Sequence, residues 1–301
     1  MRTTIAWPTL AWIWIAQGIG GSTPALTKLA LDGLEPFSLV VARQILGALF
    51  LVVLLVLPQR MRGGATLPPA PWTRRDLVLL VTLSWVGFAL PQILGAIGLA
   101  TSSATHGALL SPLEPIGILV GAALVLREPL GFAHVLAGAL GVLGTIAIVL
   151  SGTGDARGGD LRGDLVMAAG HLCWAIYTLA AKPLVARHDP LRVAVFAGAI
   201  SWSPLLPFAL RESLDVERAL PALGWVVLLA LLASAVATVA WNRALREVSA
   251  ATMALFVFVQ PAVGLAVGVG LGERAGLGAI LGTIAIVCGV AIATLRGARV
   301  P

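Results

Sequence analysis

The sequence predicts an all-α polytopic membrane protein, in which ten transmembrane helices form two five-helix repeats of inverted topology. Three observations predict this fold class. The composition is too apolar for a surface that faces water on all sides. Apolar runs of membrane-spanning length recur from one end of the chain to the other, and the two halves share a local sequence pattern.

The composition excludes an ordinary soluble domain. Of the 301 residues, 58% are hydrophobic and 11% are charged, and the mean hydropathy is +0.97. Soluble domains carry roughly 25% charged residues, so this chain lacks the polar side chains that such a surface needs. Apolar runs of about 20 residues can cross a bilayer as helices. Helices are favoured over strands because a lipid-exposed backbone must satisfy its hydrogen bonds within itself.

The apolar runs divide the chain into two repeats. The first run, from Trp7 to Ala16, continues through "QGIGGSTPALTKLA" without an A-x-A cleavage site, so we interpret it as a membrane helix and not as a signal peptide. The first repeat, residues 1–151, has predicted spans at 6–28, 36–58, 77–99, 102–126 and 131–151. A linker rich in Gly and Asp follows at 152–162. The second repeat, residues 163–301, has predicted spans at 163–185, 190–210, 221–242, 249–271 and 275–296, each bounded to within about three residues.

The Lys and Arg residues predict the orientation. With the N-terminus inside, thirteen of the 20 fall on the inner side and seven, Arg43 among them, on the outer side. Since cytoplasmic loops carry the excess of Lys and Arg, we expect both termini in the cytoplasm. The same residues stand singly or in pairs between apolar runs, which argues for a bilayer partner and against nucleic acid, despite a net charge of +6.

The internal repeat is clearest at "SATHGALLSPLEPIGIL" (103–119) and "SAATMALFVFVQPAVGL" (249–265), which are identical at six of seventeen positions. The shared proline, Pro115 or Pro261, follows a polar residue, Glu114 or Gln260. Because each repeat has an odd number of spans, the second enters the membrane from the opposite side. Inverted repeats suit alternating access around a site at their interface.

Glu114 is the leading candidate for chemistry. It lies about twelve residues into its span and therefore roughly 18 Å deep. A carboxylate there costs a few kcal/mol and usually faces a cavity. Ser103, His106 and Glu114 fall on one helical stripe, and Gln260 ends the equivalent stripe of the second repeat. Substrate anchoring and proton binding are both open, as is the alternative that Glu114 and Gln260 only hydrogen-bond neighbouring helices.

The prolines after these residues also have two interpretations. Pro115 and Pro261 each remove a backbone donor in mid-helix and free a carbonyl about one turn earlier. A simple kink is the plainer expectation. A hinge or a cavity-facing carbonyl is the functional one.

The remaining cavity candidates either share helical faces with other polar or aromatic side chains or, in the first span, sit among glycines where backbones approach closely or helices break. His171 could equally be a satisfied core histidine. In the third span, Trp85 and Gln92 are seven residues apart and therefore share a face. The candidates are His171, Trp174, Tyr177, Trp85, Gln92, Gln17 and Ser22.

Several site types are missing from the sequence. The four histidines have no metal-site spacing with each other or with Cys173 and Cys288, so we expect no metal. "GIGGST" (18–23) lacks the Lys-Ser/Thr ending of a phosphate loop. We therefore expect no catalytic residues, no cofactor and no nucleotide hydrolysis.

Local motifs resemble the drug/metabolite transporter (DMT) superfamily, specifically its EamA type. "SPLEPIGILVGAALVLREPLG" (111–131) and "QPAVGLAVGVGLGERAG" (260–276) resemble its proline-containing helix in each repeat. Lys28, Glu35-Pro36 and Arg43 resemble the signatures of its first two helices, and 163–184 resembles the opening of its second module. The resemblance implies two five-helix modules and an exporter of small metabolites in the cytoplasmic (inner) membrane that works without ATP. YddG-like amino-acid exporters are the nearest subgroup.

One departure from the family pattern is Gly20-Gly21, where a Trp-Gly pair is usual, although Trp174 keeps its place before Lys182. We expect this change to enlarge a cavity at the first helix. We expect no Arg or Lys deep in a span, so the lining suits a small zwitterion or an amphipathic neutral solute, such as a neutral or aromatic amino acid. A passive facilitator and an intramembrane enzyme are the alternatives. A monomer is expected, and a dimer stays open.

Overall fold

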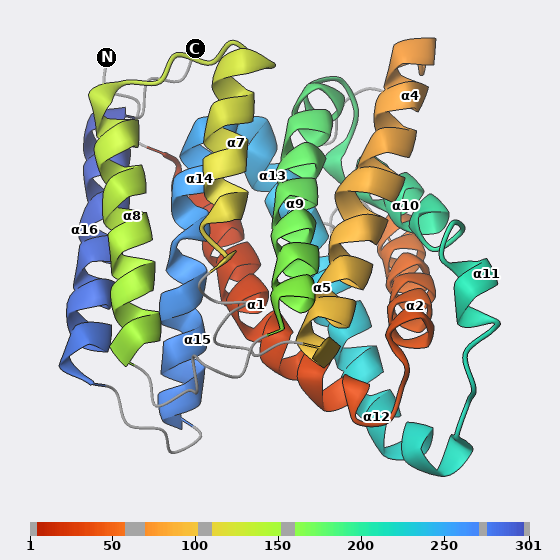
Figure 1. Cartoon of the computed structure of the whole chain (residues 1–301). Coiled ribbons are helices and arrows are strands. Elements are labelled where there is room, and N and C mark those ends of the chain that lie inside the picture. Colours follow the sequence, from red (N-terminus) through yellow and green to blue (C-terminus); the bar gives the residue numbers. More distant parts are fainter. Residues whose placement is uncertain (1–4, 58–69, 102–109, 152–159, 271–275, 298–301) are drawn as a thin grey trace.

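The computed structural model describes residues 5–57, 70–101, 110–151, 160–270 and 276–297, and all regular secondary structure within them is helical. The prediction of an all-α chain is confirmed for this part of the protein. Figure 1 shows the helices packed side by side. α1 (Trp7–Leu31) begins and α16 (Leu277–Gly297) ends toward the top of this view.

The other helices of the first half follow α1 along the chain. They are α2 (Pro36–Val56), α4 (Arg74–Thr82), η1 (Leu83–Ala89), α5 (Leu90–Thr101), α7 (Leu113–Leu124) and α8 (Phe132–Ser151). Those of the second half precede α16. They are α9 (Leu161–Arg187), α10 (Pro190–Ser201), α11 (Leu206–Ala209), α12 (Val216–Leu229), η2 (Ala230–Val236), α13 (Ala237–Glu247), α14 (Ala250–Val257) and α15 (Val259–Gly270).

Five of the described helical segments are long and apolar enough to cross a membrane, and shorter apolar helices accompany them. The five are Pro36–Val56, Arg74–Thr101, Phe132–Leu150, Leu161–Arg187 and Val216–Glu247. Large apolar side chains such as Leu124 and Phe132 are mostly exposed on the outside of the bundle. Such a surface suits contact with lipid, because lipid tails are as apolar as the side chains themselves.

Three of the predicted spans are interrupted in the structure. The predicted helix at 190–210 ends at Ser201, and only the short α11 follows, because Pro204 and Pro207 cannot donate backbone hydrogen bonds. The predicted helix at 249–271 breaks at Phe258. Within the predicted span at 102–126, a turn at Ser111 and Pro112 precedes α7, and residues 102–109 lie outside the described part.

Two π-helical segments occupy corresponding places in the two halves. η1 joins α4 to α5 and η2 joins α12 to α13, each over seven residues. The amide of Leu90 bonds the carbonyl of Trp85, and that of Ala237 bonds the carbonyl of Leu232, five residues back in each case. π-Bulges are rare and occur frequently at functional sites. Both segments lie in the middle of the helix that contains them.

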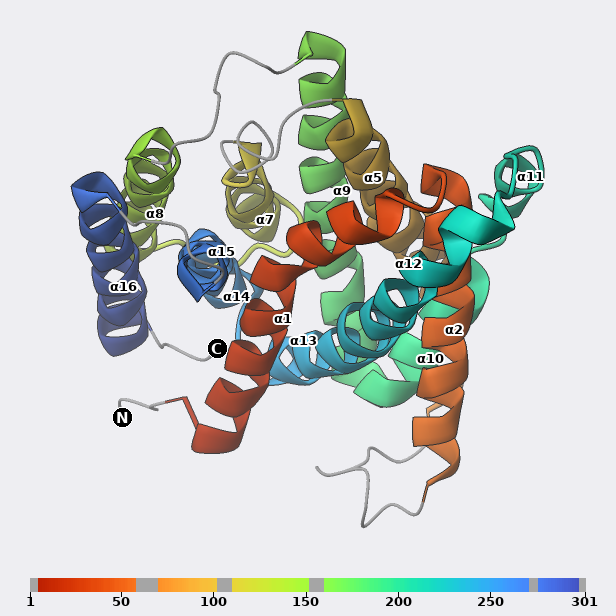
Figure 2. The same cartoon turned by 90° about the horizontal axis from the view of Figure 1, so that it is seen from below.

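The first helix of each half packs into the opposite half. α1 contacts α12, α13 and α15, whereas α9 contacts η1, α5 and α7. Figure 2 shows α1 crossing beside α13, and α9 beside α5. This reciprocal exchange brings the two halves into extensive contact at the centre of the molecule.

Close glycine packing joins α8 to α16, which lie side by side in both views (Figures 1 and 2). A Cβ atom added at Gly144 would lie 2.6 Å from the carbonyl oxygen of Gly282, and one added at Gly282 would overlap the carbonyl oxygen of Gly144. Small residues let membrane helices approach this closely.

We expect Gly144→Ala to lower the free energy of unfolding by about 1–3 kcal/mol, because the methyl group would overlap a backbone that cannot yield. The melting temperature in detergent should fall by roughly 2–12 °C. Gly224→Ala is the matched control, since nothing lies within 4 Å of a Cβ atom there. Equal melting temperatures for the two variants would contradict this close packing.

Candidate functional site

The central site begins at two helix interruptions. Glu114 lies in the first turn of α7, directly after the turn at Ser111 and Pro112. Gln260 lies in the first turn of α15, directly after the break at Phe258. The two residues therefore occupy equivalent positions in the structure as well as in the sequence alignment.

The prolines that follow these residues were expected in the middle of a helix, and the structure places them elsewhere. Pro115 and Pro261 both lie in the first turn of a helix, where a missing amide proton removes no intrahelical bond. The helices are interrupted before the prolines and continue through them. The structure thus favours a broken helix over a simple kink at both places.

Gln260 reaches across to the first helix. Its side-chain Nε2 donates a hydrogen bond of 2.9 Å to Oε1 of Gln17, which is completely buried in α1. Nε2 of Gln17 is buried and has no hydrogen-bond partner among the described residues. Gln17 comes from the first half and Gln260 from the second, so this amide pair joins the two halves.

Glu114 reaches across in the opposite direction. Its Oε2 lies 3.8 Å from Nδ1 of His171 in α9, and the two side chains are 13% and 23% exposed. Nδ1 of His171 is itself buried and makes no hydrogen bond within the described residues. This acid–histidine pair also joins the halves, through the fourth predicted span of one and the first of the other.

The two pairs are equivalents of each other. The alignment that matches Pro115 with Pro261 also matches Glu114 with Gln260. The alignment that matches Lys28 with Lys182 also matches Gln17 with His171. Each pair consequently joins the first helix of one half to the interrupted helix of the other. One pair can change its charge and the other cannot.

Aromatic side chains form a wall beside His171. The ring of Trp174 lies edge-on to Phe88 and Tyr177, with centroids 5.8 and 5.5 Å away. Tyr177 is buried, and its hydroxyl donates a 2.9 Å hydrogen bond to Oδ1 of Asn242. Gly87 lets η1 approach this wall, since a Cβ there would lie 2.6 Å from Cα of Tyr177. The wall therefore combines residues of both halves.

The other predicted cavity residues are less well placed. Trp85 is 43% exposed, whereas Gln92 is buried, and neither polar atom of Gln92 has a hydrogen-bond partner among the described residues. The wider turn of η1 changes the register between them, so their spacing of seven does not give them similar surroundings. Ser22 bonds the carbonyls of Gly18 and Ile19 in its own helix. His106 lies outside the described residues.

Gly20 does not open a cavity, in contrast to the expectation. A Cβ atom at Gly20 would lie 2.7 Å from Nε2 of Gln260, and one at Gly21 would lie 2.7 Å from its backbone oxygen. The side chain of Gln260 thus fills the space above Gly20. The two glycines instead allow α1 and α15 to approach closely enough for the amide pair to form.

Arg43 corrects the expectation that no cation lies deep in a span. It is buried in α2, and its Nε donates a 3.2 Å hydrogen bond to Oγ of Ser234 in η2. Its side chain is therefore surrounded by protein and not by water. The resemblance indicated this arginine as a signature, but only the structure shows its contact with the π-helix.

A further contact between the halves was not predicted. Glu128, between α7 and α8, accepts hydrogen bonds from the amides of Ala250 and Ala251 at 3.0 and 2.9 Å. Nζ of Lys182 donates to the carbonyls of Leu245 and Val248 at 2.8 and 2.6 Å. The Glu128 carboxylate and the Lys182 ammonium together hold the turn between α13 and α14. We call these two side chains and their contacts the polar clamp.

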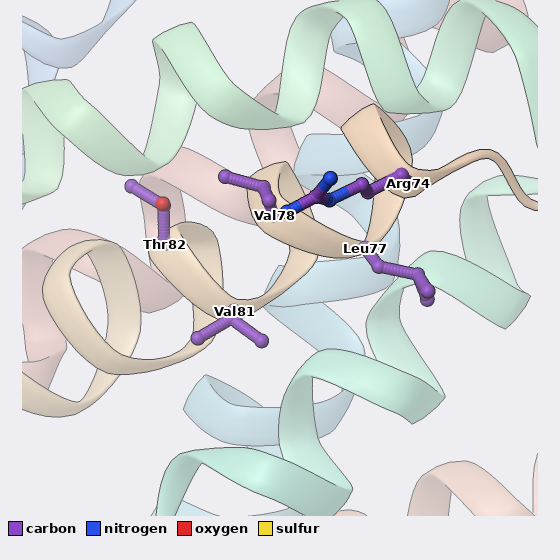
Figure 3. Close-up of a pocket in the computed structure, with 5 residues that line it drawn as sticks. All are labelled: Arg74, Leu77, Val78, Val81 and Thr82. Carbon is purple, nitrogen blue, oxygen red and sulfur yellow. The ribbon is translucent and has the colours of Figure 1, made fainter.

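A hollow on the outer surface is a poor candidate for the site. It measures about 320 Å³ and is lined by Arg74, Leu77, Val78, Val81 and Thr82, all from α4 (Figure 3). Leu77, Val78 and Val81 are exposed apolar side chains, as expected on a lipid-facing surface. Within the described residues, no three His, Cys, Asp or Glu side chains gather as metal ligands.

Comparisons with known proteins agree with this architecture. The sequence profile of the EamA-like transporter family matches residues 7–150 and again residues 161–295. YyaM of Bacillus subtilis (strain 168), named an uncharacterized transporter, is 22% identical over 279 residues, which cover 91% of this chain and 89% of YyaM. YetK of the same organism, also named an uncharacterized transporter, is 25% identical over 287 residues, or 93% of this chain and 85% of YetK.

A relative with a more specific name covers less of the chain. A protein of Streptantibioticus cattleyicolor, named a probable terminal-alkyne amino-acid exporter, is 30% identical over 196 residues, 64% of each chain. A solved crystal structure superposes with a TM-score of 0.74 at 22% identity, covers 95% of this chain and 96% of its own, and shares the fold. Because the family profile covers almost the whole length in two consecutive matches, the chain belongs to the EamA-like transporter family, in the drug/metabolite transporter superfamily.

Proposed function

We propose that this transporter is a secondary exporter of small neutral or aromatic amino acids, which it carries across the cytoplasmic membrane by alternating access. Its two repeats, residues 1–151 and 163–301 joined by the linker 152–162, would supply ten spans in inverted topology with both termini in the cytoplasm. It would work as a monomer in the bilayer.

The observation that carries the proposal is the pair of equivalent polar contacts between the halves. Gln17 with Gln260 and Glu114 with His171 bring polar groups together in an otherwise apolar bundle, beside interrupted helices. Polar groups in membrane spans are expensive and usually line a substrate pathway. Transporters with inverted repeats place their sites at such interruptions, near the middle of the membrane.

The chemistry of these groups supports an amino-acid substrate. The carboxylate of Glu114 can accept hydrogen bonds from an ammonium group, and the unpaired Nε2 of Gln17 can donate one to a carboxylate. The Trp174 wall offers apolar area for a side chain. The relative named an amino-acid exporter supports the same substrate class.

Counterflow in proteoliposomes tests the proposal. Purified protein is reconstituted with one unlabelled amino acid inside, and entry of the same labelled amino acid is followed for a panel of aromatic, aliphatic, acidic and basic amino acids. We expect saturable counterflow of the aromatic or neutral members and none in empty liposomes. Absence of counterflow for every panel member, with correctly inserted protein, would overturn the proposal.

A further inference from the structure

The two equivalent polar pairs differ in one chemical property. The amide pair, Gln17 with Gln260, holds no ionisable group, whereas both members of the acid–histidine pair, Glu114 and His171, can bind or release a proton. We propose that the acid–histidine pair is the proton-coupling site of this transporter and that each substrate leaves in exchange for one proton at this pair. The inference rests on the proposed function.

The geometry of the pair suits reversible protonation. The Nδ1–Oε2 distance of 3.8 Å is too long for a hydrogen bond, so the two groups are close without being bound to each other. Both side chains keep part of their surface exposed, at 13% for Glu114 and 23% for His171. A proton or a substrate ammonium group can therefore reach the carboxylate without first breaking a tight ion pair.

Few other charges among the described residues compete for this pair. α7 packs against α9 and α14, and the described residues of α14 hold no titratable side chain. On α7 the only titratable group is Glu114 itself, and on α9 the nearest to His171 in sequence is Cys173. His134, at the start of the neighbouring α8, accepts a hydrogen bond from the amide of Gly131.

A second acid–histidine contact shows what a fixed pair looks like. Oδ2 of Asp76 lies 3.2 Å from Nε2 of His188, and both side chains are 3% exposed. Arg187 also lies 3.0 Å from Oδ1 of Asp76, and Thr73 bonds the same carboxylate through its amide and hydroxyl. Arg187 and two hydrogen-bond donors of Thr73 hold the Asp76 carboxylate in place. Within the part of the chain that the structure describes, His171 is the only basic side chain that pairs with Glu114, so protonation of Glu114 can follow the transport cycle.

Exchange at this pair defines the path of the proton through the transport cycle. In one half-cycle the pair takes up a proton from the side to which it is open. In the other it releases that proton when the substrate ammonium group takes its place against Glu114. Since the amide pair cannot titrate, the coupled proton is held by the acid–histidine pair, and one substrate ammonium group that takes its place against Glu114 displaces one proton. Export of a zwitterion in exchange for one proton moves one positive charge inward, so membrane potential should drive transport as well.

Transport driven by a pH gradient tests the inference, with the panel amino acid that shows the fastest counterflow as the probe. In the wild-type protein, one coupled proton and a gradient of one pH unit support accumulation of up to about tenfold. We expect Glu114→Gln to abolish this accumulation, so that the inside and outside concentrations become equal. Counterflow should be slowed but still measurable. Glu217→Gln, which alters an exposed carboxylate at the start of α12, is the matched control and should accumulate like the wild type.

Proton release in detergent provides a readout that a structural role would not change. Adding the same amino acid to wild-type protein in weakly buffered solution should release up to one proton per molecule, and Glu114→Gln should release none. His171→Gln should shift the pH dependence of counterflow. Counterflow without any response to the gradient in the wild type would overturn the coupling site and leave the proposed function standing. No counterflow for any panel member would overturn both.

Discussion

Replacing Glu128 with alanine is expected to expose the start of α14 and to speed hydrogen exchange at Ala250 and Ala251. The carboxylate of Glu128 accepts both of these backbone amides, which no intrahelical carbonyl can satisfy. A hydrogen bond to a charged group contributes about 1.5–3 kcal/mol. Loss of one such bond corresponds to roughly ten- to a hundredfold faster exchange, measurable by mass spectrometry on peptides that cover 249–252.

The matched control is Glu212→Ala. Glu212 makes the same kind of contact at the start of α2, where its carboxylate accepts hydrogen bonds from the amides of Phe37 and Ser38 at 3.0 and 2.7 Å. This variant should speed exchange at 37–38 and leave the start of α14 protected. Unchanged exchange at Ala250 and Ala251 in Glu128→Ala would show that the polar clamp does not hold this turn.

The polar clamp should also matter for transport. Glu128 belongs to the first half and the turn that it holds belongs to the second, so under the proposed alternating access we expect this contact to change as the halves move. A loss of about 1.5–3 kcal/mol from one conformation shifts the equilibrium between conformations by the same free energy. We therefore expect Glu128→Ala to slow counterflow about tenfold or more.

Removal of the Trp174 ring is the second change with a large expected effect. Trp174→Ala leaves a gap beside Phe88 and Tyr177, where two edge-on ring contacts are lost. We expect counterflow of an aromatic amino acid to fall about tenfold or more, since an aromatic contact contributes roughly 0.5–1.5 kcal/mol beyond the apolar area that it buries. Initial rates at several substrate concentrations measure the change.

Two further variants separate binding from folding. Trp174→Phe keeps an aromatic ring and should retain most of the counterflow. Trp7→Ala alters a side chain that is 85% exposed and should behave as the wild type. If Trp174→Ala transports as well as Trp174→Phe, at similar melting temperatures, the aromatic wall has no part in substrate binding.

The sequence predicted that the chain is helical, and it singled out the two polar residues that follow the helix interruptions. The polar residue before each shared proline indicated Glu114 and Gln260, and the structure places both in the first turn after a helix interruption. The interruptions themselves were not predicted. Apolar residues on both sides of Phe258 continue the hydrophobic run, and hydrophobicity reports burial in lipid without reporting where the backbone turns.

The burial of Arg43 shows a second limit. Counting charges assumes that each cation reaches the water on one side of the membrane, but Arg43 hydrogen-bonds Ser234 inside the bundle. Gly47 allows this approach, since a Cβ there would lie 2.6 Å from Cβ of Ser234. The π-helical form of η2, which places Ser234 opposite α2, has no signature in its sequence "ALLASAV".

The sequence by itself determined that this chain is a helical membrane protein with two related halves, because apolar length and internal similarity depend only on the order of residues. Only the tertiary structure decided which polar groups meet. The amide pair joins residues 243 positions apart, and the acid–histidine pair joins α7 to α9. In a membrane both the lipid-facing and the core-facing sides of a helix are apolar, so periodicity does not indicate how one helix is rotated against another. Packing at small residues such as Gly20 and Gly87 sets that rotation, and with it the site.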